Sequence, residues 1–134
     1  MDPPLQKVYG SNAHLEPRIQ EADFTVVAEQ DGQLVGVAAV KYEPWNRRGE
    51  VWHVYVAKAA RRRGIGTALM NELVVFARSV GARCLWVETQ NVNFPAIQFY
   101  RRAGFRFCGL DEAFYDPEGP GPDEIALFWV RELT

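Results

Sequence analysis

Short alternating runs of apolar and polar residues along the chain predict a sheet of several strands. Six runs are rich in β-branched and aromatic residues and have the length of strands: 24–29, 34–42, 50–57, 83–88, 105–110 and 125–131. The first two runs are separated by Asp31-Gly32, a pair that is typical of a tight hairpin turn. The segment EPWNRRG, residues 43–49, predicts a loop before the third strand.

Two further segments have the spacing of helices. Apolar side chains recur every three or four positions over residues 64–80, at Ile65, Ala68, Leu69, Leu73, Phe76, Ala77 and Val80. Gly81 then provides a helix stop, and a shorter helix over 95–102 begins with proline. Residues 11–22 are interrupted by Pro17 and predict at most a short or irregular helix.

The order strand, turn, helix, strand over residues 50–88 predicts a crossover connection. Strands 50–57 and 83–88 should therefore be parallel neighbours. Strands and helices thus alternate along an α/β (α+β) chain. A length of 134 residues fits one domain, and no repeat or internal boundary divides residues 1–134.

Composition narrows the class of protein. With 48% hydrophobic and 24% charged residues, the chain has the make-up of a soluble globular domain. It contains no apolar run of membrane-spanning length, and MDPPLQKVYG lacks the apolar core of a signal peptide. Cys84 and Cys108 form neither a metal-binding spacing nor a disulfide framework, so we expect free thiols in the cytoplasm. His14 and His53 are far apart, and no metal site is expected.

Charge is unevenly distributed along a chain whose net charge is −2. The segment 51–71 contains four bases and no acid: Lys58, Arg61, Arg62 and Arg63. The segment 111–124 contains six acids and no base: Asp111, Glu112, Asp116, Glu118, Asp123 and Glu124. Each cluster is either a solvated surface or, respectively, a site for an anion and a site for a cation. The acidic balance of the whole chain argues against nucleic acid as a partner.

The stretch 61-RRRGIG-66 is a candidate anion site because it leads directly into the predicted helix. A helix start offers unpaired N–H groups and a partial positive charge, which together suit a phosphate. Gly64 and Gly66 carry no side chain that would block an approaching anion, and the arginines add positive charge. Taken alone, the stretch also fits a glycine turn that enters a core helix beside a solvated arginine cluster.

Two motifs resemble those of the GNAT N-acetyltransferases. The pattern Arg61-x-x-Gly64-x-Gly66 after a strand is similar to the (Q/R)xxGx(G/A) motif that binds the pyrophosphate of acetyl-CoA in that family. The pattern Asn93-x-x-Ala96-x-x-Phe99-Tyr100, followed by Gly104-Phe105, is similar to the family's NxxAxxFY…GF signature. The motifs occur in the expected order and on the expected elements.

Longer stretches resemble, more narrowly, the streptothricin acetyltransferases. These are WNRR (45–48), ETQNVNFPAIQFYRRAGF (88–105) and CGLDEAFYD (108–116), and the resemblance covers residues 24–131. It implies the GNAT acyl-CoA N-acyltransferase fold: a mixed, mostly antiparallel sheet with a central parallel strand pair, helices on both faces and a shortened N-terminus. It also implies direct acetyl transfer from acetyl-CoA, bound as a co-substrate without a metal, to an amine in a ternary complex.

The resemblance assigns a cofactor site residue by residue. The pyrophosphate and the 3′-phosphate would be held by Arg61, Arg62, Arg63, Gly64, Ile65 and Gly66. Thr67 would add a hydroxyl or only pack at the helix start. The N–H of Val54 would bind the thioester carbonyl, and Val56 would pair with the pantetheine like an added strand. Tyr55 lies between these two and belongs to the same expected site. Asn93 would bind the pantetheine amides, cap the short helix or do both, with Ala96 and Tyr100 on that helix.

The implied chemistry requires a base and an acid. A primary amine with a pKa of roughly 10.4 is almost wholly protonated at neutral pH, so a base is useful. Glu50 and Glu88 are the candidate bases, and the plain alternative for each is an inert carboxylate at a strand end. His53 is a third candidate, although strand alternation places it opposite Glu50 and Val54, against the helix. Tyr100 matches the family's general acid, and Phe99 is the aromatic residue expected in the core.

The identity of the acceptor stays open at this point. About 23 residues precede the first predicted strand, fewer than the family's usual first strand and two helices, so the acceptor pocket is expected to be open, remodelled or completed by another subunit. The acidic segment 111–124 suits a cationic amine of a small molecule: a streptothricin-like antibiotic, an aminoglycoside or a polyamine. The alternatives are acetylation of protein lysines or N-termini, and a non-catalytic acetyl-CoA-binding module. A homodimer is possible, since Trp45, Phe114, Tyr115 and Trp129 could face a partner subunit or the core.

Overall fold

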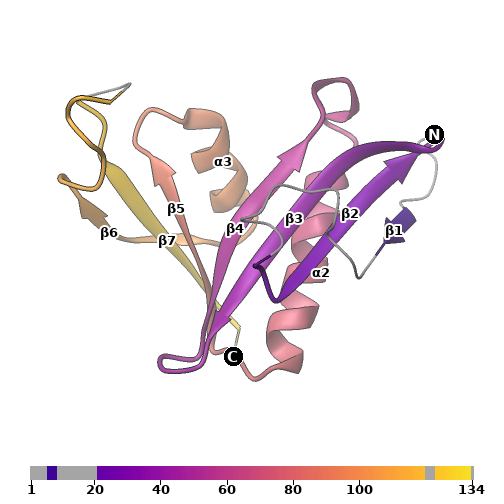
Figure 1. Ribbon diagram of the computed structural model, residues 1–134, viewed down its shortest axis with the longest axis horizontal. Coiled ribbons are helices and arrows are strands. Elements are labelled where there is room, and N and C mark those ends of the chain that lie inside the picture. The colour runs from indigo at the N-terminus through magenta and orange to yellow at the C-terminus, as the bar shows by residue number, and fades with distance from the viewer. Residues whose placement is uncertain (1–5, 9–20, 120–122, 134) are drawn as a thin grey trace.

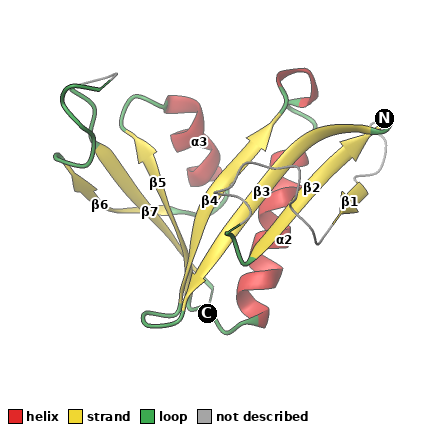
Figure 2. Ribbon diagram, in the orientation of Figure 1, coloured by secondary structure: helices red, strands yellow, loops and turns green. Residues whose placement is uncertain are grey.

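A single mixed sheet forms the framework of the protein. The computed structural model describes residues 6–8, 21–119 and 123–133, and in this part of the chain the sheet has seven strands in the order β1-β2-β3-β4-β5-β7-β6 (Figures 1 and 2). The strands are β1 (Gln6–Val8), β2 (Phe24–Gln30), β3 (Gln33–Glu43), β4 (Arg48–Val56), β5 (Cys84–Gln90), β6 (Arg106–Asp111) and β7 (Ala126–Glu132). The helices are the 3₁₀ turn η1 (Lys58–Ala60), α2 (Ile65–Ser79) and α3 (Phe94–Arg102).

The predicted elements are confirmed with shifts of one or two residues at their ends. All six predicted strands and both predicted helices are present. The hairpin between β2 and β3 turns at Asp31 and Gly32, whose φ angles of 51° and 76° are those of a two-residue type I′ turn. The helix expected over 11–22 lies mostly in residues 9–20, outside the described part of the chain, and the described residues 21 and 22 are not helical.

Both described α-helices lie on one face of the sheet. β4 and β5 are parallel and joined through α2, and β5 and β6 run in the same direction and are joined through α3. Right-handed crossovers that progress in one direction place their helices on the same face. Residues of both helices accordingly belong to one core cluster, which includes Leu69, Leu73 and Tyr100. The apolar spacing of α2 is explained by this burial, since its inward positions are almost fully covered.

The sheet parts in its middle, between β4 and β5 (Figure 1). Parallel pairing joins Arg48 to Cys84, Gly49 to Leu85 and Glu50 to Trp86, and then stops. Both strands continue without each other, β4 to Val56 and β5 to Gln90. The upper half of β4 therefore lacks a strand neighbour on its β5 side within the described residues.

A β-bulge directly after the last parallel pair accounts for the parting. Val40 of β3 lies opposite Val51, but the preceding Ala39 lies opposite His53, so Trp52 is an extra residue on β4. A bulge bends its own strand and increases the local twist. β4 therefore keeps its pairing with β3 while it turns away from β5.

Gly49 lies on the short part of β4 that still pairs with β5. We expect a larger side chain at this position to be too large for the space around it. A Cβ atom there would lie 2.9 Å from Leu85 Cδ2 and 3.4 Å from Val40 Cγ2. We expect Gly49→Val to lower the free energy of unfolding by about 1–3 kcal/mol through overpacking. Urea unfolding measures this loss. Gly109→Val is the matched control, because a Cβ at Gly109 meets nothing within 4 Å, and equal losses in the two variants would contradict the argument.

Candidate functional site

The turn before α2 presents unpaired backbone donors. Gly64 adopts the left-handed conformation, with φ of 76°, and α2 begins at the next residue. The first helical hydrogen bond runs from Ala68 N to Gly64 O over 3.0 Å. The N–H groups of Ile65, Gly66 and Thr67 therefore have no acceptor inside the helix and carry the positive end of its dipole. A side chain on Gly64 would meet nothing within 4 Å, so the space beside these donors is open.

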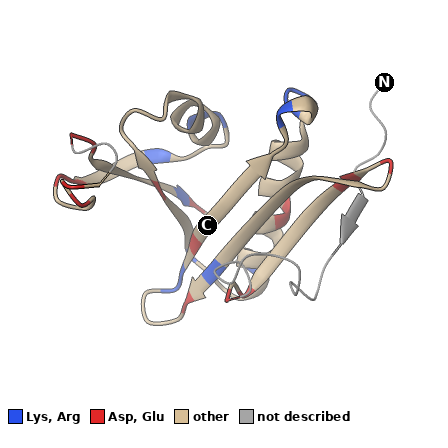
Figure 3. Cartoon of the chain, turned by 45° about the horizontal axis from the view of Figure 1, so that its top comes forward, with Lys and Arg blue, Asp and Glu red and all other residues tan. Residues whose placement is uncertain are grey.

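The three arginines of the motif are exposed and hold different positions. Arg61 Nε donates to Val56 O over 3.0 Å, which folds that guanidinium back toward the end of β4. Arg63 Nη1 donates to Gln30 Oε1 over 3.2 Å. Arg62 has a positive φ of 68° in the middle of the turn. Figure 3 shows basic residues gathered at this turn and acidic residues on the connection between β6 and β7.

Gly66 allows the two helices to approach each other. A Cβ atom at this position would lie 3.0 Å from Phe99 Cε1 and 3.7 Å from Val56 Cγ2. The second glycine of the motif is therefore required for the contact of α2 with α3 and β4. Ala96 of α3 packs against the same core, so the two sequence motifs meet in space.

A cavity of about 310 Å³ lies between α2 and α3. It is lined by Thr67, Met70, Asn71, Arg102, Ala103, Gly104 and Arg131. Thr67 was predicted as a site residue, whereas Arg102 and Arg131 were not. The sequence signal for Arg102 is its place in the last turn of α3, but only the packing of the helices brings it close to Thr67. Arg131 also donates from Nη1 to Ala103 O over 3.0 Å.

Strand β4 offers further backbone groups on its β5 side. Ala57 N donates to Val35 O over 2.7 Å, so the pair 35–57 is hydrogen-bonded. In an antiparallel ladder bonded and non-bonded pairs alternate, which makes Gly36–Val56 and Ala38–Val54 non-bonded pairs. The backbone groups of Val54 and Val56 therefore face away from β3, toward the side that β5 has left. The backbone groups of Tyr55 face β3. Tyr55 is nevertheless an exposed residue.

Asn93 caps α3, as one of its two predicted roles required. Its Oδ1 accepts a hydrogen bond from Ala96 N over 3.2 Å, and Pro95 occupies the first turn. The cap satisfies one of the free donors of this helix start and fixes where the chain leaves β5. Ala96 is thereby held at the start of α3, on the side that contacts the core.

Tyr100 is buried, and its partner Phe99 is less so. Tyr100 is 7% exposed and packs edge-on against Phe99 and Phe105, with ring centroids 5.3 Å apart in both pairs. Phe99 packs against the core, as expected, but it is only partly buried, and Tyr100 is the more deeply buried of the two. Burial raises the pKa of the Tyr100 phenol, and the charge of Glu88 raises it further. The phenol is consequently protonated at neutral pH.

The bulge at Trp52 changes the faces that alternation predicts. Val51 and Val54 both belong to the core face, with Trp52 and His53 between them. Glu50 and His53 therefore share the opposite face, and the expectation that His53 lies opposite Glu50 and against the helix is wrong. The expectation that His53 and Val54 lie on opposite faces of the strand is confirmed. Both candidates, Glu50 and His53, are half-buried.

Glu88 has a partner that the sequence did not indicate. It is half-buried on β5 and accepts a short hydrogen bond from the Tyr115 hydroxyl, which comes from the connection between β6 and β7. Burial raises the pKa of the Tyr115 phenol, as do the bond to Glu88 and the negative charges of Glu88 and Glu124. Tyr115 stood in the sequence only as an aromatic residue that could face the core or a partner subunit. Trp129, one of the same group, is in the core and donates to Thr89 Oγ1 over 2.9 Å.

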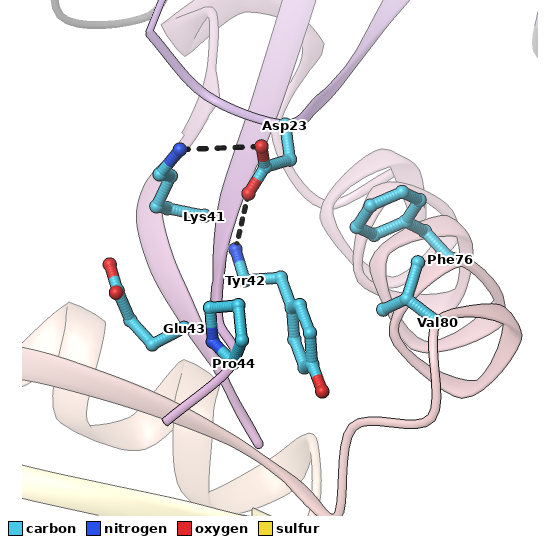
Figure 4. Close-up of a pocket in the computed structure, with 7 residues that line it drawn as sticks. All are labelled: Asp23, Lys41, Tyr42, Glu43, Pro44, Phe76 and Val80. Atoms are coloured by element: carbon cyan, nitrogen blue, oxygen red, sulfur yellow. Dashed lines mark hydrogen bonds and ion pairs between the residues drawn. The ribbon is translucent and has the colours of Figure 1, made fainter. Parts of the chain in front are cut away.

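A second cavity lies between the end of β3 and the last turns of α2 (Figure 4). It measures about 450 Å³ and is lined by Asp23, Lys41, Tyr42, Glu43, Pro44, Phe76 and Val80. Both oxygens of the Asp23 carboxylate accept hydrogen bonds, one from Lys41 Nζ over 3.3 Å and the other from Tyr42 N over 2.7 Å. Phe76 stacks on Phe24. This cavity contains none of the predicted site residues.

Other site types find no support in the described part of the chain. No group of three or more His, Cys, Asp or Glu side chains there is arranged to hold a metal ion. Both cysteines are free, Cys84 buried and Cys108 exposed, as predicted. No helix among the described residues is long and apolar enough to cross a membrane.

Comparisons with known proteins agree with this architecture. The chain matches the model of the Acetyltransferase (GNAT) family over residues 3–105. It is 47% identical over 120 residues to streptothricin acetyltransferase of Streptomyces lavendulae, covering 85% of this chain and 64% of that protein. The crystal structure of nourseothricin acetyltransferase superposes with a TM-score of 0.79 at 46% identity, covering 83% of this chain and 65% of that one. A putative streptothricin acetyltransferase from Bacillus anthracis str. Ames, in complex with acetyl coenzyme A, gives 0.77 at 27% identity, covering 84% and 64%.

The fold and the site define an α+β protein of the acyl-CoA N-acyltransferase type. The chain belongs to the GNAT acetyltransferase family. It spans between 51% and 64% of the length of the first three curated relatives that it matches.

The burial of Tyr100 predicts a loss of stability at alkaline pH. The fold raises the pKa of this phenol above the usual value near 10, so the folded chain keeps a proton that the unfolded chain releases. This contribution to the free energy of unfolding is complete below about pH 10 and declines as the pH rises above it. Tyr100→Phe removes the titrating group, so its free energy of unfolding should fall less steeply between about pH 9.5 and 11 in urea titrations. Identical slopes for the two proteins would contradict the assignment.

Proposed function

We propose that this protein is an N-acetyltransferase that transfers the acetyl group of acetyl-CoA to a primary amine of a cationic small molecule. The observation that carries the proposal is the parted strand β4. Its Val54 and Val56 backbone groups face away from β3 beside the free amides that begin α2. Membership of the GNAT family and the activities named for relatives at 46% and 47% identity support the same reaction.

The cofactor half of the site fits a pyrophosphate followed by an extended amide-containing arm. The amides of Ile65, Gly66 and Thr67 and the arginines of the turn would hold the phosphates, and the open space at Gly64 admits them. Arg102 and Arg131, at the cavity between α2 and α3, offer further positive charge for the 3′-phosphate. The backbone of Val56 would pair with the pantetheine amides as an added strand would.

The reaction requires a neutral amine, a polarised carbonyl and a protonated leaving group. Glu88 or Glu50 would accept the proton of the attacking amine, directly or through water. The N–H of Val54 would stabilise the negative charge that develops on the thioester oxygen as the amine attacks. Tyr100 would donate a proton to the departing thiolate, and the burial of its phenol keeps that proton in place at neutral pH. Transfer is then direct, within one ternary complex.

The acceptor that we favour is a small molecule with several positive charges, such as a streptothricin-like antibiotic, an aminoglycoside or a polyamine. The acids near the parted strands, Glu50 and Glu88, and the acidic connection between β6 and β7 favour a cation. The names of the relatives at 47% and 46% identity point to a streptothricin-type amine.

The proposed function predicts amine-dependent release of CoA thiol. A panel that includes streptothricin, an aminoglycoside, a polyamine and a lysine peptide should show turnover with at least one cationic small molecule, measured with a thiol reagent. Tyr100→Phe should lower kcat by about 100-fold, since general acid–base groups contribute roughly 10²–10⁴-fold. Its affinity for acetyl-CoA, measured by calorimetry, should change by less than about threefold. Binding of acetyl-CoA without any amine-dependent turnover would show a binding module, and turnover with the peptide alone would show a protein acetyltransferase.

The arginine turn predicts a specific loss of cofactor affinity. Arg61→Ala should weaken acetyl-CoA binding by about tenfold, which corresponds to roughly 1.4 kcal/mol, by removing one charge beside the pyrophosphate. The loss should shrink at high salt because the contact is electrostatic. Arg78→Ala is the matched control, since Arg78 is exposed in the last turn of α2, at the other end of this helix from the arginine turn. Calorimetry that finds equal affinities for both variants would remove the arginine turn from the cofactor site.

A further inference from the structure

Glu88 lies on the part of β5 that has lost its neighbour β4. The last residue of β5 that pairs with β4 is Trp86, two positions earlier. Glu88 and Trp86 share the face of the sheet that points away from α2 and α3, since Leu85 and Val87 on the other face belong to the core. A half-buried carboxylate in this position requires a hydrogen-bond donor to offset its lost hydration.

Tyr115 supplies this donor from a distant part of the chain. The two residues are 27 positions apart, and the Tyr115 hydroxyl donates to Oε2 of Glu88. The bond engages Oε2, and Oε1 is the other oxygen of the same carboxylate. The bond therefore fixes the direction in which Oε1 is presented.

A row of aromatic rings holds Tyr115 in place. Phe114 packs edge-on against Tyr115 and against Phe128 of β7, with centroid separations of 5.1 Å and 6.0 Å. Phe128 stacks on Trp86 at 5.1 Å, and the Arg48 guanidinium lies 4.4 Å from the Trp86 ring centroid. These contacts connect the loop to the start of β4, where the sheet is still joined. The position of Tyr115 is therefore set by the same strands that part at the site.

Half of the acids of the loop help to shape it. Asp111 Oδ1 accepts from Ala113 N, and Asp116 Oδ1 accepts from Glu118 N, each over 2.9 Å. Glu124 accepts from Gln90 Nε2 over 2.6 Å, which ties the end of the loop to the end of β5. Three of the six acids of 111–124 thus have partners inside the protein. Asp111 and Asp116 therefore stabilise local turns, and Glu124 fixes the loop to β5.

We infer that Tyr115 is a positioning residue for the acceptor amine: it orients Glu88 at the parting of β4 and β5 so that Oε1 receives the amine. The inference rests on the proposed function and adds a residue that acts through Glu88. The raised pKa of the Tyr115 phenol agrees with this geometry, because a phenol that keeps its proton remains a donor to the carboxylate.

The test is a kinetic double-mutant cycle on the whole protein with the best amine of the panel. Tyr115→Phe keeps the ring and its packing and removes the hydroxyl. It should lower kcat/KM for the amine by about tenfold and leave KM for acetyl-CoA unchanged. In a Glu88→Gln background the same change should cause less than about a twofold further loss, because the hydroxyl acts through Glu88.

The matched control is Tyr42→Phe, which removes a half-buried hydroxyl at the other cavity and should leave both kinetic constants unchanged. Two results would overturn the inference and leave the proposed function standing. One is a kcat/KM of Tyr115→Phe equal to that of the wild type. The other is a double variant whose loss of kcat/KM equals the product of the losses of Tyr115→Phe and Glu88→Gln. Absence of amine-dependent turnover in the wild type would overturn both.

A second measurement examines the bond without reference to turnover. Tyr100 also ionises late, so the titration is made in a Tyr100→Phe background, where ultraviolet absorbance should show a late-ionising phenol that is lost when Tyr115→Phe is added. Glu88→Gln should bring this ionisation toward lower pH, since the bond to Glu88 and its charge raise the phenol's pKa. An unchanged titration midpoint of this phenol in Glu88→Gln would show that the two side chains do not interact in solution. This result would contradict the positioning role of Tyr115.

Discussion

The site depends on one break in hydrogen bonding, the place where β4 stops pairing with β5. Backbone groups of a strand inside a sheet are normally paired on both sides, and here the extra residue Trp52 bends β4 after three parallel pairs. The amides of Val54 and Val56 are thereby made available to a ligand without any special side chain. A ligand with its own amides can take the place of the missing strand, which is why this geometry suits the arm of acetyl-CoA.

The helices complete the same site because they pack closely around the parted strands. Gly66 lets Phe99 of α3 approach α2 and Val56 of β4, and Gly64 supplies the left-handed turn that begins α2. The free donors at the start of α2 and the open side of β4 are therefore adjacent, joined by the bond from Arg61 to Val56. In the proposed function one ligand contacts both, with its phosphates at the helix and its arm along the strand.

The proposed acceptor side is organised by a different part of the chain. Aromatic contacts from Phe114 to Phe128 and from Phe128 to Trp86 bring the connection between β6 and β7 onto the open face of β5. Tyr115 reaches Glu88 as a result. The charge separation seen in the sequence is preserved in space, with bases at the α2 turn and acids on this connection. Yet half of these acids are engaged in shaping the loop.

The sequence by itself determined six of the seven described strands, both described helices, the parallel pair, the glycine turn and the two motifs, because these follow from local spacing and from the backbone freedom of particular residues. The three-residue strand β1 was not predicted. It did not determine the bulge at Trp52, since one extra residue in a ladder depends on the register of the partner strand. For that reason the face of His53 was predicted wrongly. The pairing of Tyr115 with Glu88 and the approach of Arg102 to Thr67 were likewise decided only by the tertiary structure, which alone brings distant positions within reach of each other.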